Sequence, residues 1–423
     1  MGLAVTWARP LRPGRDPIPG PAGRAVTAFY LARSASLIGD SAAAACLALL
    51  IFQRFGPVQA LGAFFIARAA PRLLGPVLGS LSDGRDLRRL LRACDALSAV
   101  RYAVIALLVP GLAGLLVLVV AAEIVAVIRL PGTRTAVTRL LPEERLTNAT
   151  ATVTAIAGLS TAAGAAFGGL ISAFVGARYG LALNALSFVG SALLMTTLPA
   201  MPPQPGPEHT GAAGGFRRLV VGFPVLLSRR VRILPLVLVI IAFAAALDRT
   251  ALVVLSQRVL TDGSSLTYGF AIGAVSIGVF LSAILVRRRP AVVGYPALVV
   301  ALALQGGSHA LAGASPDAAA LVLVTLIIGF GNGLEVIVAM RLLQRSVDRS
   351  SLGAATGALL TSTTLLDAAG SALGAALLTK VSARAVFYIA GITMLTAVAP
   401  TYLSARRPAR SEGDNVASHP DTP

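Results

Sequence analysis

The sequence predicts an all-α membrane protein in which twelve transmembrane helices form two pseudo-symmetric halves of six. The prediction rests on the composition, the lengths of the apolar runs and the distribution of arginine. Of the 423 residues, 56% are hydrophobic and 13% are charged, and the mean hydropathy is +0.80. A soluble domain is about 25% charged. This chain therefore has too few charges to cover a globule with polar surface, and its expected solvent is the bilayer.

The apolar runs have the length that crossing a membrane requires, which is about 20 residues of helix. Pro110 and Gly111 alone divide the third run from the fourth. The twelve helices are predicted at 26–52, 58–81, 93–110, 112–131, 149–175, 179–199, 233–255, 266–286, 291–313, 318–340, 353–378 and 384–404.

The basic residues support this division, because cytoplasmic segments of membrane proteins carry an excess of Lys and Arg. With both termini placed in the cytoplasm, the inside segments hold 24 of the 36 basic residues and the outside segments hold five. The remaining seven lie within predicted helices. We therefore expect a multi-pass protein of the plasma (inner) membrane with both termini cytoplasmic.

A polar stretch divides the chain into two predicted halves. Its run from Met201 to Pro207 contains four prolines, which cannot continue a helix. We expect a cytoplasmic N-terminal segment (1–25), an N-terminal half (26–199), a cytoplasmic linker (200–232), a C-terminal half (233–404) and a cytoplasmic tail (405–423). Residues 139–169 align without gaps to 345–375, and these segments fall on equivalent helices of the two halves. This internal repeat favours a duplication.

The loop after the second predicted helix carries a specific motif. It contains Gly79, Asp83 four residues later, and the basic pair Arg88 and Arg89. This pattern resembles the signature loop of the major facilitator superfamily, although Gly84 stands where a basic residue is usual. The resemblance implies a gate between the second and third helices. The alternative is an ordinary basic inside loop.

Two further motifs resemble the drug-efflux branch of that superfamily, which includes macrolide exporters. One is Leu37-Ile38-Gly39-Asp40 in the first helix. The other is the segment from Pro142 to Ala149 at the junction into the fifth helix. The fifth helix also contains the small-residue motif Gly164, Gly168 and Gly169, where antiporters of the superfamily commonly carry a Pro that Ala165 replaces here. The resemblance implies an antiporter that confers drug resistance, with close helix packing at these glycines. Generic helix packing is the alternative.

Charged groups inside the membrane are costly and are therefore candidates for function. Asp40 lies near mid-membrane, and Arg33 precedes it by seven residues on the same helix face. We expect Asp40 to carry a proton or a substrate cation; a static Asp40–Arg33 pair is the alternative. Glu335 and Asp367 are further proton-coupling candidates. Several others lie near span ends and are expected to be structural, namely Arg72, Asp95, Arg129 and Arg341.

Five polar or amphipathic residues in the spans are candidates for lining a substrate cavity. They are Tyr102, Asn184, Gln305, His309 and Asn332. Each could bond to substrate, or it could satisfy a polar group on a neighbouring helix.

The expected function is secondary active transport by alternating access, in the form of proton-coupled efflux of a small drug-like compound or secondary metabolite. The alternative is an importer or uncoupled facilitator with the same fold. The three histidines are scattered and no nucleotide-binding motif is present, so we expect no enzyme, cofactor or metal site. Apolar runs interrupt the basic residues, which argues against a nucleic-acid partner. The expected partners are a small-molecule substrate, protons and the lipid bilayer, and the expected state is a monomer.

Overall fold

The computed structural model describes residues 20–56, 58–75, 78, 85–140, 143–202, 220–228, 231–260, 264–289, 291 and 293–405. Within these ranges the regular structure is helical and contains no strand, so the all-helical prediction is confirmed. The labelled α-helices are α1 (Gly20–Phe55), α2 (Val58–Ala69), α4 (Leu87–Leu108), α5 (Leu112–Leu140), α6 (Glu143–Phe174), α7 (Ala177–Leu194), α9 (Ile233–Val254), α10 (Ser265–Arg288), α11 (Tyr295–Ala314), α12 (Ala318–Ser346), α13 (Arg349–Leu377), α14 (Ala383–Leu395) and α15 (Val398–Ala405). Short 3₁₀ turns follow α2 (η1, Ala70–Leu74) and α7 (η3, Met195–Thr197), and a π turn follows α9 (η4, Leu255–Val259).

The predicted count of twelve helices is not confirmed, because the described residues form thirteen labelled α-helices. The difference arises in the last predicted span, 384–404, where a turn at residues 396–397 separates α14 from α15. Pro400 lies just after this turn. It has no N–H to donate to the carbonyl of Thr396, so a continuous helix would lack that bond.

Eight of the described helical segments are long and apolar enough to cross a membrane. Large apolar side chains also remain exposed on them: Val117 is 67%, Leu186 is 65% and Leu323 is 63% exposed. Water would make such a surface costly, whereas lipid tails solvate it. The exposed surface thus agrees with a multi-pass membrane protein.

Capping residues explain several helix starts. The side chain of Asp86 accepts a hydrogen bond from the backbone N–H of Arg89 at the start of α4. Asp317 does the same for Ala320 at the start of α12, and Ser382 for Ala385 at the start of α14. Such caps satisfy N–H groups that have no partner within the helix. They are especially useful where water is scarce.

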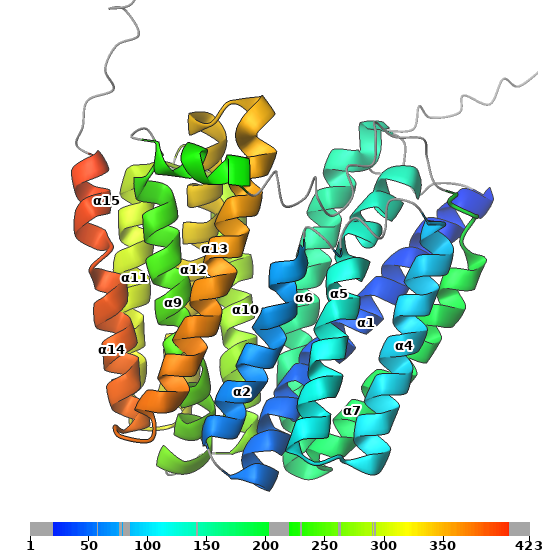
Figure 1. Cartoon of the computed structure of the whole chain (residues 1–423), viewed down its shortest axis with the longest axis horizontal. Coiled ribbons are helices and arrows are strands. Elements are labelled where there is room, and N and C mark those ends of the chain that lie inside the picture. Colours follow the sequence, from blue (N-terminus) through cyan, green and yellow to red (C-terminus); the bar gives the residue numbers. More distant parts are fainter. Residues whose placement is uncertain are drawn as a thin grey trace, which may run out of the picture.

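Figure 1 shows α1 and α4–α7 on one side of the molecule and α9–α15 on the other, with α2 between them. Helix α2 packs on α13, and α6 packs on α10. Large core clusters lie within each group of helices, one around Phe64 and Phe188 and another around Leu298 and Val338.

The two groups of helices touch closely at one end of the molecule, where α6 ends and α10 begins (Figure 1). A Cβ atom added to Gly169 would lie 2.7 Å from the Cα of Gly269. The start of α2 and the end of α13 meet at the same end, where a Cβ on Gly62 would collide with Ala375. Only glycine permits backbones to approach this closely.

Candidate substrate cavity and buried charges

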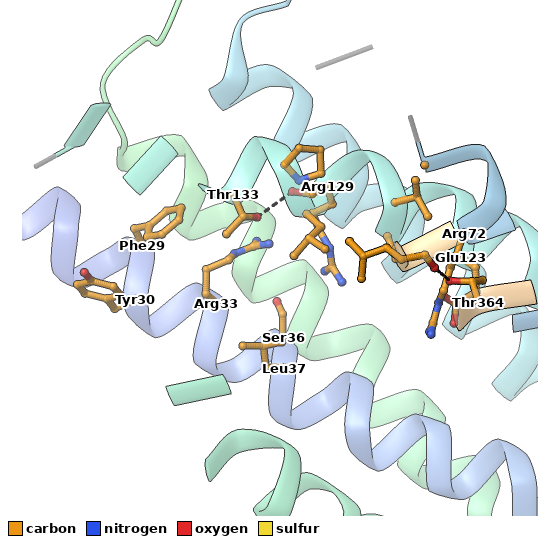
Figure 2. Close-up of a pocket in the computed structure, with 16 residues that line it drawn as sticks. Phe29, Tyr30, Arg33, Ser36, Leu37, Arg72, Glu123, Arg129, Thr133 and Thr364 are labelled. Atoms are coloured by element: carbon orange, nitrogen blue, oxygen red, sulfur yellow. Dashed lines mark hydrogen bonds and ion pairs between the residues drawn. The ribbon is translucent and has the colours of Figure 1, made fainter. Parts of the chain in front are cut away.

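A cavity of about 670 Å³ lies between α1, α5, η1 and α13 (Figure 2). Small-molecule sites typically measure about 300–1,000 Å³. The lining residues on α1 lie in the first half of that helix, and most of those on α5 lie in its second half, so the cavity lies toward the end opposite the Gly169–Gly269 contact. Part of its wall is apolar, including Phe29, Leu37, Val127, Leu130 and Leu360. Its charged lining groups are Arg33, Arg72, Glu123 and Arg129.

A second, smaller cavity of about 160 Å³ adjoins the first and shares Arg72, Glu123 and Arg129 with it. Its further polar lining groups are Asp40, Arg68, Ser98, Arg101 and Tyr102. The two cavities therefore form one region in which an apolar space continues into a strongly charged one. The predicted candidates Asp40 and Tyr102 both lie there, whereas Arg33 lines only the larger cavity.

Asp40 is bound by two residues from other helices. Arg129 Nη2 donates to Asp40 Oδ2 over 2.7 Å, and the Tyr102 hydroxyl donates to Oδ1 over 3.1 Å. The Asp40 side chain is 27% exposed. The ring of Tyr102 stacks on Phe188, so the phenol that reaches Asp40 is held in place. Asp40 thus faces the cavity as a carboxylate with a fixed cationic partner.

The alternative of a static Asp40–Arg33 pair is wrong, because Arg33 pairs with Asp95. Arg33 also donates to Ser191 over 2.8 Å, and the Ser191 hydroxyl donates to Asp95 over 2.7 Å. Arg129 Nη1 lies 3.5 Å from the other oxygen of Asp95. The four charges form a chain in the order Arg33, Asp95, Arg129, Asp40.

Asp95 and Arg129 were expected to be span-end residues, and this is wrong. Asp95 is fully buried, and the Arg129 side chain is 13% exposed. Helix α4 begins six residues before the predicted start at 93, and α5 runs nine residues past the predicted end at 131. Both residues consequently lie well inside their helices. The capping residue Asp86 was the sequence signal for the early start of α4.

Glu123 is shared by two arginines. Arg68 Nε donates to Oε1 over 2.9 Å, and Arg72 lies 3.1 Å from Oε2. Figure 2 shows Arg72 and Glu123 together at one end of the larger cavity, away from Arg33. The sequence analysis named Arg72 but did not predict this contact, because the three residues lie on different elements.

In the second group of helices, Asp367 forms a two-bond ion pair with Arg249, with distances of 2.6 and 3.0 Å. Glu335 is 2% exposed and accepts a hydrogen bond from Gln305 Nε2 over 3.1 Å. It forms no ion pair with any other described residue. The two acidic candidates of this group therefore differ: one is held by a cation and the other only by an amide.

A buried polar chain continues from Gln305 to His309 and Asp248. His309 Nδ1 lies 2.7 Å from the carbonyl oxygen of Gln305, and Nε2 lies 3.2 Å from Asp248 Oδ2. Because a carbonyl oxygen only accepts, Nδ1 must carry a hydrogen in this geometry. A hydrogen bond between Nε2 and Asp248 then requires one more proton on that pair. Sequence reasoning identified His309 but not its bond to Asp248.

The remaining predicted residues have mixed outcomes. Asn184 is buried and packs against Gly39, and Asn332 is half-buried in α12. Gly164 and Gly168 pack closely against α1, and only Gly169 of that motif contacts the other group of helices.

The predicted gating motif is only partly described. Gly79 and Asp83 lie outside the described residues. Arg88 donates to the carbonyl oxygen of Leu198 over 2.9 Å, and Arg89 is exposed. The predicted terminal segments and linker also lie mostly outside the described ranges. Within those ranges, no three His, Cys, Asp or Glu side chains are grouped so that they could hold a metal ion.

Comparison with known proteins gives one consistent result. The family model described as Major Facilitator Superfamily matches residues 29–366 and 295–420. The fold is similar to that of nucleoside transporter NupG, with a TM-score of 0.71 and 13% identity over 92% of this chain and 100% of that one. It is also similar to the human organic anion transporter MFSD10 (TETRAN), with a TM-score of 0.64 and 19% identity over 90% of this chain and 100% of that one. No curated protein sequence matches the chain.

A third similar structure is a POT family transporter in complex with thioalcohol conjugated peptide. Its TM-score is 0.69, with 13% identity over 90% of this chain and 95% of that one. At these identities the likeness concerns the fold. Together with the family match, it points to a transporter rather than an enzyme.

Proposed function

The chain belongs to the major facilitator superfamily, and we propose that it is a secondary active transporter that moves a small molecule across the membrane by alternating access. The cavity of about 670 Å³ carries this proposal. It lies where the two groups of helices face each other, and they close on each other at the opposite end. A cavity accessible at one end and closed at the other is one state of an alternating-access cycle.

We propose twelve membrane spans in two six-helix halves, with α14 and α15 counted as one span. Repeated glycine contacts support this division. Gly164 and Gly168 of α6 press on Ile38 and Ala42 of α1, while their repeat partners in α13 press on the corresponding part of α9. Those partner contacts are Gly370 on Phe243 and Gly374 on Leu247. The same four-residue spacing thus recurs in both groups.

We place both termini and the linker on the cytoplasmic side of the plasma (inner) membrane, on the evidence of the arginine distribution. In that orientation the cavity lies toward the cytoplasm, because the first half of α1 lines it. The closed Gly169–Gly269 contact then lies toward the exterior. The proposed functional unit is a monomer, since the cavity is formed within one chain.

Proton coupling forms part of the proposal, with Asp40 and Glu335 as its carriers. Asp40 faces the cavity and can exchange its bond to Arg129 for a proton. Glu335 has no described cationic partner, so it can take up or release a proton without breaking an ion pair. Arg33 and Asp367 are held by Asp95 and Arg249 and are assigned positioning roles.

The proposed direction is efflux, which the resemblance to the drug-efflux branch supports; import or uncoupled transport is the alternative. Growth of cells that express the chain would be measured across a panel of toxic compounds, with and without a protonophore. We expect protection against at least one compound, and its loss with the protonophore. Protection that survives the protonophore would contradict coupling, and sensitisation would favour import.

A pH jump across proteoliposomes would then separate coupled from uncoupled transport of the compound that the panel identifies. We expect flux to follow the imposed gradient in the unmodified chain. Arg92→Gln, on the exposed face of α4, is a control for the loss of one positive charge outside the cavity. Its flux should match that of the unmodified chain. Flux that ignores the pH jump would favour a facilitator.

A further inference from the structure

The charges around the two adjoining cavities do not balance. The lining contains five arginines and only two carboxylates, Asp40 and Glu123. Asp95 lies behind the wall and neutralises part of the excess. Two positive charges still exceed the acids in this cluster. The five arginines are Arg33, Arg68, Arg72, Arg101 and Arg129.

Arg101 is the clearest part of this excess. Its guanidinium carbon lies 3.8 Å from the ring centroid of Tyr102, which holds the side chain at the wall of the smaller cavity. Among the residues that the structure describes, Arg101 has no ion-pair partner. The nearby acids are already occupied, Asp40 by Arg129 and Glu123 by two other arginines.

Two buried guanidinium nitrogens on residues that line the smaller cavity make no hydrogen bond. They are Nε of Arg101 and Nη1 of Arg129, and the latter has only the Asp95 oxygen at 3.5 Å beside it. A buried donor without an acceptor is unfavourable, and a buried charge without a counter-charge is more so. An anion in the smaller cavity would supply both acceptors and charge.

The adjoining space has a different character. The wall of the larger cavity includes Phe29, Leu37, Val127, Leu130 and Leu360. A purely inorganic anion would leave this apolar volume unfilled. The region is therefore complementary to a molecule with one charged end and one apolar end.

We propose that this region binds an amphipathic organic anion. Its carboxylate or sulfonate head lies against Arg101 and Arg129 in the smaller cavity, and its apolar body fills the larger one. Planar guanidinium groups suit such heads because they donate two parallel hydrogen bonds. The inference rests on the proposed transport function and names its substrate class. It replaces the cationic compound that Asp40 alone suggested.

The test uses the purified full chain in detergent and two probes of matched shape, naphthalene-2-sulfonate and (2-naphthyl)methylammonium. Titration calorimetry measures their dissociation constants. We expect the sulfonate to bind at least about tenfold more tightly than the ammonium compound, a difference typical of one added charge contact. Arg101→Gln should weaken sulfonate binding about tenfold, and Arg101→Lys should restore part of it.

Arg92→Gln is the control for the loss of one positive charge outside the cavity, and a thermal unfolding curve for each variant establishes that it is folded. Equal binding of both probes, tighter binding of the ammonium compound, or no binding of either would overturn the inference. So would a folded Arg101→Gln variant that binds the sulfonate normally. The transport proposal is judged separately: gradient-driven movement of a cationic or neutral compound would leave it standing while the anion inference falls.

Discussion

Arg129 of α5 donates a 2.7 Å hydrogen bond to Asp40 of α1, and the same arginine lies 3.5 Å from Asp95 of α4. One cation therefore joins three helices at the wall of the cavity. A movement of α1 relative to α5 must lengthen this bond, whereas a movement of both helices together leaves it intact. The bond thus connects the state of one carboxyl group to the position of two helices.

Asp40→Asn tests that connection. The amide oxygen can still accept from Arg129 and the amide NH₂ can donate to the Tyr102 hydroxyl, but the group can neither hold a negative charge nor take up a proton. We expect the variant to fold and to lose at least about tenfold of its pH-driven flux, since a charge-assisted hydrogen bond and a protonation site both disappear. Transport in proteoliposomes after a pH jump measures this. Unchanged flux would remove Asp40 from the coupling mechanism.

Asp95→Ala should act on stability. The substitution leaves Arg33 without its only described ion-pair partner. It also removes the carboxylate oxygen that lies 3.5 Å from Arg129. Removing one member of a buried ion pair costs about 3–5 kcal/mol. We expect a clear fall in the thermal unfolding temperature in detergent. Replacing both members of the pair, as Arg33→Met with Asp95→Leu, should recover part of the loss; a single variant as stable as the unmodified chain would contradict the buried pair.

Glu335→Gln tests the second coupling candidate. The glutamine can still accept the hydrogen bond from Gln305, so we expect the fold to be retained. A carboxamide cannot exchange a proton near neutral pH. Substrate exchange at equal pH on both sides should therefore survive, whereas accumulation driven by a pH gradient should be lost. Normal gradient-driven accumulation would exclude Glu335 as a carrier.

Gly169→Val tests the closed end of the molecule. The added side chain would meet the backbone of α10 at Gly269 and Ser265, so it should force the two groups of helices apart there. A single cysteine at Thr364, which lines the cavity on α13, would report the change through its rate of maleimide labelling. We expect slower labelling, because opening one end closes the other in an alternating-access cycle.

Gly307→Val is the matched control for that experiment, because nothing lies within 4 Å of a Cβ at Gly307. The native Cys46 and Cys94 are buried and would be tested for background labelling. An unchanged rate in a folded Gly169→Val variant would show that the glycine contact does not govern access to the cavity.

Helix positions were largely predictable because bilayer thickness sets the number of apolar residues. The predicted run 233–255 became α9, for example, with an end only one residue away. The errors lie at helix ends, which hydropathy alone does not set. Helix α4 starts early because Asp86 caps it, and α5 continues through Pro131.

The partners of the charged residues were not predictable from spacing. Helix periodicity relates residues three, four or seven apart on the same face, so it suggested Arg33 as the neighbour of Asp40. The observed partner, Arg129, is 89 positions away in the chain. That contact depends on how α1, α4 and α5 pack, which a single sequence does not encode in any local pattern. The residue types indicated the candidate charged residues, but the spacing did not predict which of them pair.

The glycine contact between α6 and α10 also bears on the balance between the two states of the cycle. Where backbones meet directly, little apolar surface becomes wet when they part, and hydrophobic cost scales with the area exposed. The free-energy cost of separating the two groups of helices at this contact is therefore small. A ligand that binds one arrangement more tightly shifts the population by that difference in affinity, so a small opening cost lets even a weakly bound cargo redistribute the two states.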